Sequence, residues 1–83
     1  MLAAMASNTE IEMIFVRLLD EGTDVMRPVQ AAKIESGNFR LIEPTDYDPE
    51  YETWEFTPGS IVRCDARRIN DEMILVAVEG IDE

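Results

Sequence analysis

Apolar and polar side chains alternate along much of the sequence, and this period of two is typical of strands that bury one face. Between the alternating segments stand residues that favour turns, including Ser36-Gly37-Asn38 and Pro58-Gly59. The pattern predicts extended segments over residues 25–34, 39–42, 61–69 and 73–78. Turns recur every eight to twelve residues or so, which is the rhythm of a small barrel or sandwich.

The same pattern predicts which side chains face the interior. Val62, Cys64 and Ala66 alternate with charged residues, so we expect them to point inward. Residues 73–78, MILVAV, are apolar throughout, which indicates a central strand that is buried on both faces. Pro28 cannot donate a backbone hydrogen bond, so its strand must form an edge or a bulge at that point.

Residues 10–19, EIEMIFVRLL, fit two structures. A helix is indicated by apolar residues at helical spacing and by capping signals at Thr9, Glu12 and Gly22. A strand is indicated by the β-branched and aromatic composition, with Ile14, Val16 and Leu18 on one face. We favour the strand, because the strands predicted downstream need partners for their edges.

The predicted fold is therefore all-β, a small antiparallel barrel of five to six strands. The alternative is an α+β fold in which a helix over residues 10–21 lies on a four-stranded sheet. Residues 10–83 form a single small β domain in this interpretation, and residues 1–9 form a disordered leader. With 83 residues the chain is long enough for one domain only.

The second face of the first strand raises a question of its own. If Ile14 and Val16 fill the core, then Ile11, Met13 and Phe15 place much apolar surface on the opposite face. Either the leader folds over this face or a second subunit covers it. A homodimer is therefore one of the partners that the sequence suggests.

Charge and composition narrow the function classes. A net charge of −11 argues against nucleic acid and anionic membranes as partners, and it permits a basic protein or peptide. The plainer interpretation is that the charge only keeps the chain soluble. With one cysteine and no histidine, the chain can form neither an internal disulfide nor a Cys/His zinc site. We expect no cofactor and no metal.

The cysteine content also bears on location. A lone thiol fits a reducing compartment. The first ten residues, MLAAMASNTE, lack the basic region and the long apolar core of a signal peptide. No apolar run approaches the length of a membrane span. We therefore expect a cytoplasmic protein.

The segment from Glu43 to Glu55 is the most distinctive part of the sequence. It holds six carboxylates, no Lys or Arg, and three interleaved aromatic residues. Aromatic side chains provide contact area and acids attract a basic partner, which predicts a protein-binding surface. The residues expected to make contact are Tyr47, Asp48, Glu50, Tyr51 and Trp54. The alternative is a solvated loop in which Trp54 is a core anchor.

The sequence signals for metal binding and for catalysis are weaker than the signal for protein binding. Asp46, Asp48 and Glu50 have the alternate spacing of a calcium loop, but the glycine and the final carboxylate of that motif are missing. Cys64 lacks a histidine base, so we expect a buried, unreactive thiol. The late arginines, at positions 63, 67 and 68, are expected to pair with acids across strands. Nothing selects a catalytic pair, so an enzyme is not predicted.

Two stretches carry a resemblance to known proteins. LLDEGTDVMRPV, residues 18–29, and ETWEFTPGSIVRCDARR, residues 52–68, together resemble a group of small uncharacterised bacterial proteins. The group has no assigned activity, so this resemblance implies no site. Residues 47–62 are also similar to the acidic loop and following strand of SH3-type barrels. That resemblance implies an acidic, aromatic loop that grips proline-rich peptides carrying Arg or Lys.

The SH3 likeness has departures. Three predicted strands precede the acidic loop here instead of one, and no second tryptophan follows it. The likeness therefore supports a small barrel more than it supports peptide binding. The function that we predict is a small acidic protein-binding module without catalytic activity. The alternative is an immunity-type or inhibitor-type protein that blocks a basic site on a partner enzyme.

Overall fold

The computed structural model describes residues 10–22 and 25–81, and every regular element in them is a β-strand. The expected all-β class is confirmed. Residues 11–19 form a strand, so the helix of the α+β alternative is absent from the described residues. The predicted leader, residues 1–9, lies outside them. The strands are β1 (Ile11–Leu19), β2 (Val25–Lys33), β3 (Phe39–Leu41), β4 (Thr53–Trp54), β5 (Ile61–Ile69) and β6 (Glu72–Ile81).

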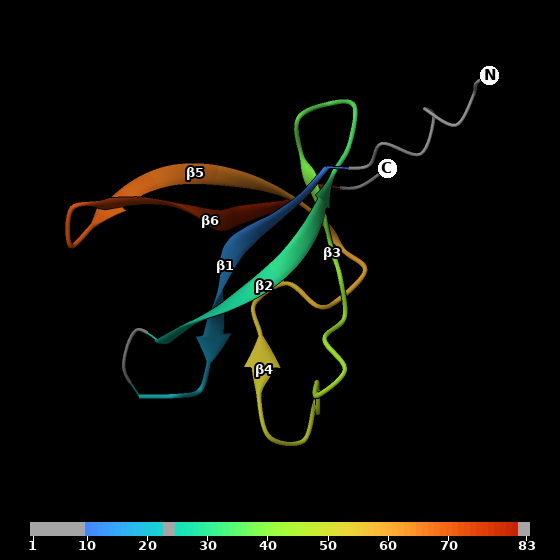
Figure 1. Cartoon of the computed structure of the whole chain (residues 1–83). Coiled ribbons are helices and arrows are strands. Elements are labelled where there is room, and N and C mark those ends of the chain that lie inside the picture. Colours follow the sequence, from blue (N-terminus) through green and yellow to red (C-terminus); the bar gives the residue numbers. More distant parts are fainter. Residues whose placement is uncertain (1–9, 23–24, 82–83) are drawn as a thin grey trace.

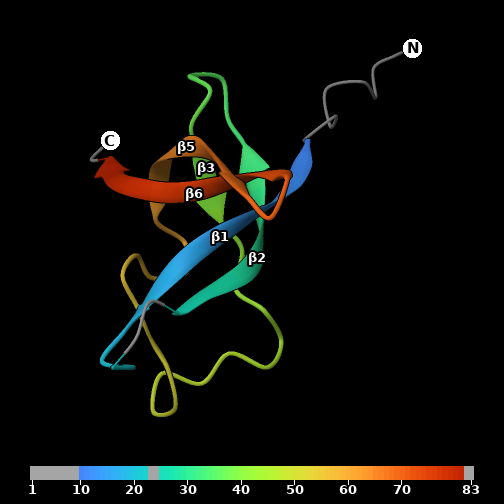
Figure 2. The ribbon, with the colours of Figure 1, turned by 90° about the vertical axis from the view of Figure 1, so that its left-hand side faces the viewer.

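The strands form one sheet that closes on itself (Figures 1 and 2). Its order is β2-β3-β5-β6-β1-β4, and an additional pairing of β2 with β1 makes a ring of five strands. All pairings are antiparallel except that of β1 with β6, which is parallel and consists of the single pair Phe15–Val76. The predicted small barrel is thus confirmed, with one parallel closure that the alternating pattern did not predict.

The core lies inside this ring. Ile14 and Val16 of β1 are fully buried, and Leu18 packs against the same cluster, as the strand interpretation predicted. Each of the remaining five strands also contributes to the cluster. Their residues are Val29, Ala31, Phe39, Leu41, Trp54, Val62 and Ala77. All buried residues in the described ranges are hydrophobic, so packing of apolar side chains is what holds the barrel together.

The local sequence accounts for the turns and the edge. Gly37 and Gly59 both have φ of 90°, a conformation that glycine adopts without strain. The Ser60 N–H donates to the Thr57 carbonyl at 3.1 Å around Pro58-Gly59, as expected for a type II turn. At Pro28, β2 pairs with β1 only, because its pairing with β3 begins at Ala31. The predicted edge is therefore confirmed.

The β5–β6 hairpin leaves the barrel part of the way along its length, as Figure 1 shows. β5 pairs with β3 only at Ile61 and Val62, and β6 pairs with β1 only at Val76. A register shift between Arg63 and Cys64 marks the departure. Beyond it, residues 66–75 pair across the hairpin with each other, apart from the hairpin turn itself. We call these residues the β5–β6 arm.

The arm corrects two predictions. Ala66 is exposed and Cys64 is half-buried, so only Val62 of the three residues expected inside is fully buried. Within residues 73–78, only Val76 and Ala77 are buried, and Met73 is 60% exposed. β6 does lie between β5 and β1, as expected of a central strand, but it meets β1 only at Val76. Most of the apolar run stays uncovered, because the bulge bends the hairpin away from the barrel.

Candidate protein-binding surface

Arg27 organises the acidic segment. Its side chain comes from β2, on the same strand parity as the buried Val29 and Ala31, and ends beside the loop. One guanidinium nitrogen donates to Asp46 Oδ1 at 2.8 Å, and another donates to Glu52 Oε2. The loop's excess negative charge is thus partly neutralised from a strand that lies far away in the sequence.

Glu52 and Trp54 continue the same network into the core. The Trp54 Nε1–H donates to Glu52 Oε1 at 2.9 Å, so both carboxylate oxygens of Glu52 have donors. The Arg27 guanidinium carbon lies 5.7 Å from the centroid of the Trp54 ring, within the range of a cation–π contact. Trp54 itself is 2% exposed, and the Tyr47 ring packs edge-on against it at 5.0 Å. An aromatic anchor therefore holds the loop to the barrel.

Backbone contacts shape the outer part of the loop. Asp48 Oδ1 accepts the Glu50 N–H at 2.9 Å, and the Asp48 carbonyl accepts the N–H groups of Tyr51 and Glu52. Such local bonding from an aspartate side chain fixes a turn. At its far end, the Glu55 N–H donates to the Arg17 carbonyl of β1 at 2.9 Å. The loop is short of regular structure but rich in defined contacts.

The exposed part of the surface is smaller than the sequence suggested. Tyr51 is 84% exposed at the end of the turn, and Glu50 beside it is exposed. Asp48 and Tyr47 are half-buried. Trp54 is buried and unavailable to a partner, so for this residue the alternative of a core anchor is correct. Tyr51, Glu50 and Asp48 form the surface that we call the Tyr51 turn.

The network also determines the charge states. The hydrogen bond from Arg27 holds the pKa of Asp46 below its usual value, and the positive charge of the guanidinium acts in the same direction. Hydrogen bonds to Glu52 and then to Asp46 raise the pKa of Arg27. Asp46 and Glu52 are therefore committed to an arginine. Glu50 and Asp48 form no ion pair with any described residue.

The calcium spacing does not produce a metal site in the described residues. Asp46 turns toward Arg27, while the Asp48 side chain accepts a backbone N–H. Across residues 10–22 and 25–81, no three Cys, Asp or Glu side chains converge as metal ligands would. Asp46 is thus used in ion pairing and Asp48 in turn formation.

Cys64 and the late arginines have the following surroundings. Burial is the main reason that the pKa of the Cys64 thiol rises to about 11, so the thiol stays protonated at neutral pH. Arg63 donates to Glu79 across the hairpin at 2.8 Å, as expected, and also to Asp65 of its own strand at 2.9 Å. Arg67 and Arg68, by contrast, form no ion pair within the part of the chain that the structure describes.

Arg27 is the residue that sequence reasoning missed. A signal for it was present, because an arginine on the buried parity of a strand needs a carboxylate partner. The pattern showed neither which carboxylate that would be nor that the loop would return to β2. Nothing in the described residues is a helix of the length and apolarity that a bilayer crossing requires. Comparison with family models, curated proteins and solved structures gave no match.

Proposed function

We propose that this protein is a small acidic protein-binding module without catalytic activity, and that the Tyr51 turn contacts a basic segment of its partner. The observation that carries the proposal is an aromatic side chain, 84% exposed, on a turn whose base is held by buried contacts. A preformed turn loses little conformational freedom on binding. Tyrosine is also among the residues that contribute most to binding energy at interfaces.

Charge supports the same assignment. Glu50 and Asp48 precede Tyr51 in the turn and form no ion pair with a described residue, while the chain as a whole carries −11. Such a surface attracts basic partners and repels acidic ones. The absence of histidine from the chain and the protonated Cys64 thiol leave no evident nucleophile with its base, which favours binding over catalysis.

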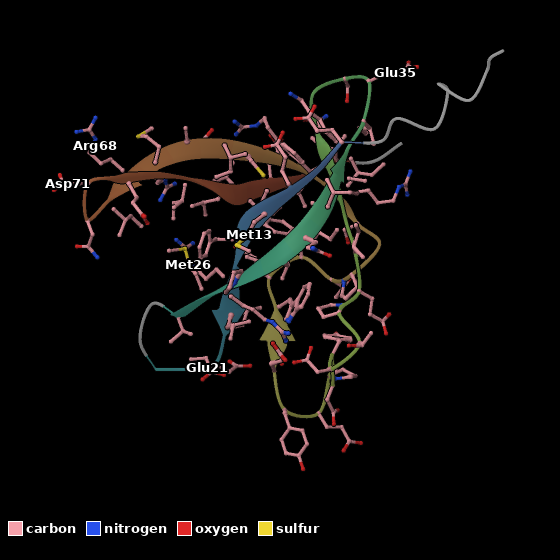
Figure 3. The ribbon with its side chains drawn as sticks, viewed as in Figure 1. Met13, Glu21, Met26, Glu35, Arg68 and Asp71 are labelled. Carbon is pink, nitrogen blue, oxygen red and sulfur yellow. The ribbon has the colours of Figure 1, made fainter. Side chains whose placement is uncertain are left out.

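Affinity capture from the native cell tests this proposal. The intact chain is immobilised, and captured proteins are quantified for the native chain, for Tyr51→Ala and for Asp48→Asn with Glu50→Gln. The asparagine keeps an acceptor for the turn. A control with Glu21→Gln and Glu35→Gln makes the same change in charge at exposed positions outside the loop (Figure 3).

We expect a basic protein that the native chain and the control retain and that both loop variants lose. A partner that all four proteins capture equally would contradict the assignment to the Tyr51 turn. The inhibitor alternative uses the same measurement. If the captured protein is an enzyme and loses activity on binding, the chain is an inhibitor, and if its activity is unchanged, the chain is a binding module only.

A further inference from the structure

A second exposed surface lies in the angle between the β5–β6 arm and the β1–β2 hairpin. Figure 3 shows Met13 and Met26 within this angle. Adjoining hollows of about 490 and 250 Å³ share Phe15, Glu72 and Ile74 in their walls. We call this surface the apolar groove; its other apolar lining residues are Met13, Met26, Ile69, Met73 and Leu75.

The groove exposes much more apolar surface than a solvated strand face needs. Met13 is 61% exposed, Met73 is 60% exposed and Ile69 is 40% exposed. Contiguous apolar surface of this kind marks an interaction site in soluble proteins. Methionine side chains suit such sites, because they are flexible and polarizable. The face that the sequence singled out on β1 is thus continuous with apolar residues of the arm.

An open strand edge runs along the same surface. Residues Glu72–Leu75 of β6 line the groove and pair with β5 alone, because β6 pairs with β1 only at Val76. Unpaired edges are templates for pairing with another chain. A partner for this surface therefore has both an apolar and a backbone contact to make.

Charges of both signs border the groove. Glu12 lines it, and Glu72 lies in the walls of both hollows. A hydrogen bond with neighbouring Glu10, together with desolvation and repulsion, raises the pKa of Glu12, while the positive charge of Lys33 acts in the opposite direction. Arg67 pairs across the hairpin with Ile74, which also lines the groove, and it has no carboxylate partner among the described residues. One surface thus holds carboxylates that form no ion pair with a described residue and an arginine that lacks a carboxylate partner among them.

We propose that a second copy of this chain covers the groove in a two-fold dimer, in which each arm lies against the groove of the other copy. A two-fold interface brings one patch against itself, so it needs a surface that is complementary to its own image. This surface has a projecting arm beside a hollow, with Arg67 on the arm and Glu12 in the wall of the hollow. Each Arg67 would then meet the Glu10 and Glu12 pair of the other copy. The proposal does not depend on the Tyr51 turn, which lies on another part of the molecule.

A charge-swap experiment tests the dimer. Mass is measured by light scattering and sedimentation over a wide concentration range for the full chain, for Arg67→Glu and for Glu12→Arg. Each variant places like charges opposite each other in its own dimer. We expect its dissociation constant to rise by roughly 10-fold or more. Mixing the two variants restores opposite charges at both contacts, so a heterodimer of near-native affinity should form.

Glu35→Arg is the matched control, because it makes the same charge change at an exposed turn remote from the groove. It should dimerise at least as well as the native chain. Circular dichroism verifies that each variant is folded, and Met73→Ser, which changes no charge, should also weaken the dimer. A native chain that stays monomeric at high micromolar concentration would overturn the proposal. Variants that all dimerise like the control would also overturn it.

Discussion

The acidic loop and the β5–β6 arm hold their exposed side chains by opposite means. The loop contains only the two-residue strand β4, yet Trp54, Glu52 and Arg27 connect it to the interior through hydrogen bonds and packing. The arm consists of two regular strands, but past the bulge its only backbone partners are its own residues. The arm is therefore less firmly attached to the barrel than the loop is, although its secondary structure is more regular.

The two regions therefore expose different kinds of surface. In the loop, a buried aromatic ring fixes the position of the exposed Tyr51, so the surface is preformed for a partner. In the arm, apolar side chains such as Met73 remain exposed because no other strand covers them. A polar, anchored surface suits recognition by charge and shape, whereas an apolar surface with open strand edges suits association. Four predictions test this contrast, and they are ordered by expected effect.

Trp54→Ala should have the largest effect. Removing a buried tryptophan costs about 3–5 kcal/mol, which is roughly 100- to 5,000-fold in the folding equilibrium. Domains of this kind have about 5–15 kcal/mol in total, so the variant should be close to unfolding. Urea denaturation measures the loss. The stability of Trp54→Phe should lie between that of the native chain and that of Trp54→Ala, because phenylalanine keeps an aromatic ring but lacks the donor to Glu52. A loss under about 1 kcal/mol would show that the loop is not anchored in this way.

The second prediction concerns the position at which the barrel ends and the arm begins. The pKa of Cys64 is raised from 9.0 to about 11, so its thiolate at pH near 8 should be about 100-fold scarcer than in the unfolded chain. Alkylation by iodoacetamide should slow by a similar factor. The matched control is Ala66→Cys in a Cys64→Ala background, since Ala66 lies two residues further along β5 and is exposed. If both thiols react at the same rate, the arm does not begin at the bulge.

Arg27→Met should cost about 2 kcal/mol, or roughly 30-fold in the folding equilibrium, because it leaves the half-buried Glu52 without its arginine. Arg68→Met on the arm, which loses no ion pair with described residues, should cost less than about 0.5 kcal/mol. Urea denaturation of both variants at several pH values measures the difference.

The pH dependence of the Arg27 effect has a defined sign. Arg27 lowers the pKa of Asp46 in the folded state. The stabilisation that comes from this ion pair is therefore present above the usual carboxylate range and is lost as the pH falls through the lowered pKa. The stability gap between native protein and Arg27→Met should thus narrow as the pH falls below about 4. A gap that stays constant down to pH 2 or so would mean that Arg27 acts only through packing.

The sequence predicted many of the core positions, and the positions that it predicted wrongly have a physical explanation. Alternation identified Ile14, Val16 and Val62 as core residues, because a closed sheet buries one face of each strand. It failed at Ala66 and Met73, because the pattern of a strand says nothing about where its neighbours end. A bulge at Arg63 and Cys64, which no residue type specifies, decides that point.

The candidate surface was predicted in the same uneven way. Local composition identified the acidic, aromatic segment, and the exposure of Tyr51 agrees with a contact role. The burial of Trp54 depends on β4 pairing with β1, and the role of Arg27 depends on β2 lying beside the loop. Both are contacts between distant segments, which one sequence does not encode in any local pattern.

The smallest effects on folding should come from the most exposed side chain of each region. Tyr51 is 84% exposed and Met73 is 60% exposed, so truncating either to alanine should change the stability of the dilute monomer by less than about 0.5 kcal/mol, or roughly 2-fold. Their effects on association should nevertheless differ. Tyr51→Ala should lose the basic partner and leave self-association unchanged, because the turn stands apart from the groove. Met73→Ala should weaken self-association and leave partner capture unchanged. Loss of both properties in one variant would mean that the two surfaces act as one, and the contrast between an anchored turn and an uncovered arm would then have no functional consequence.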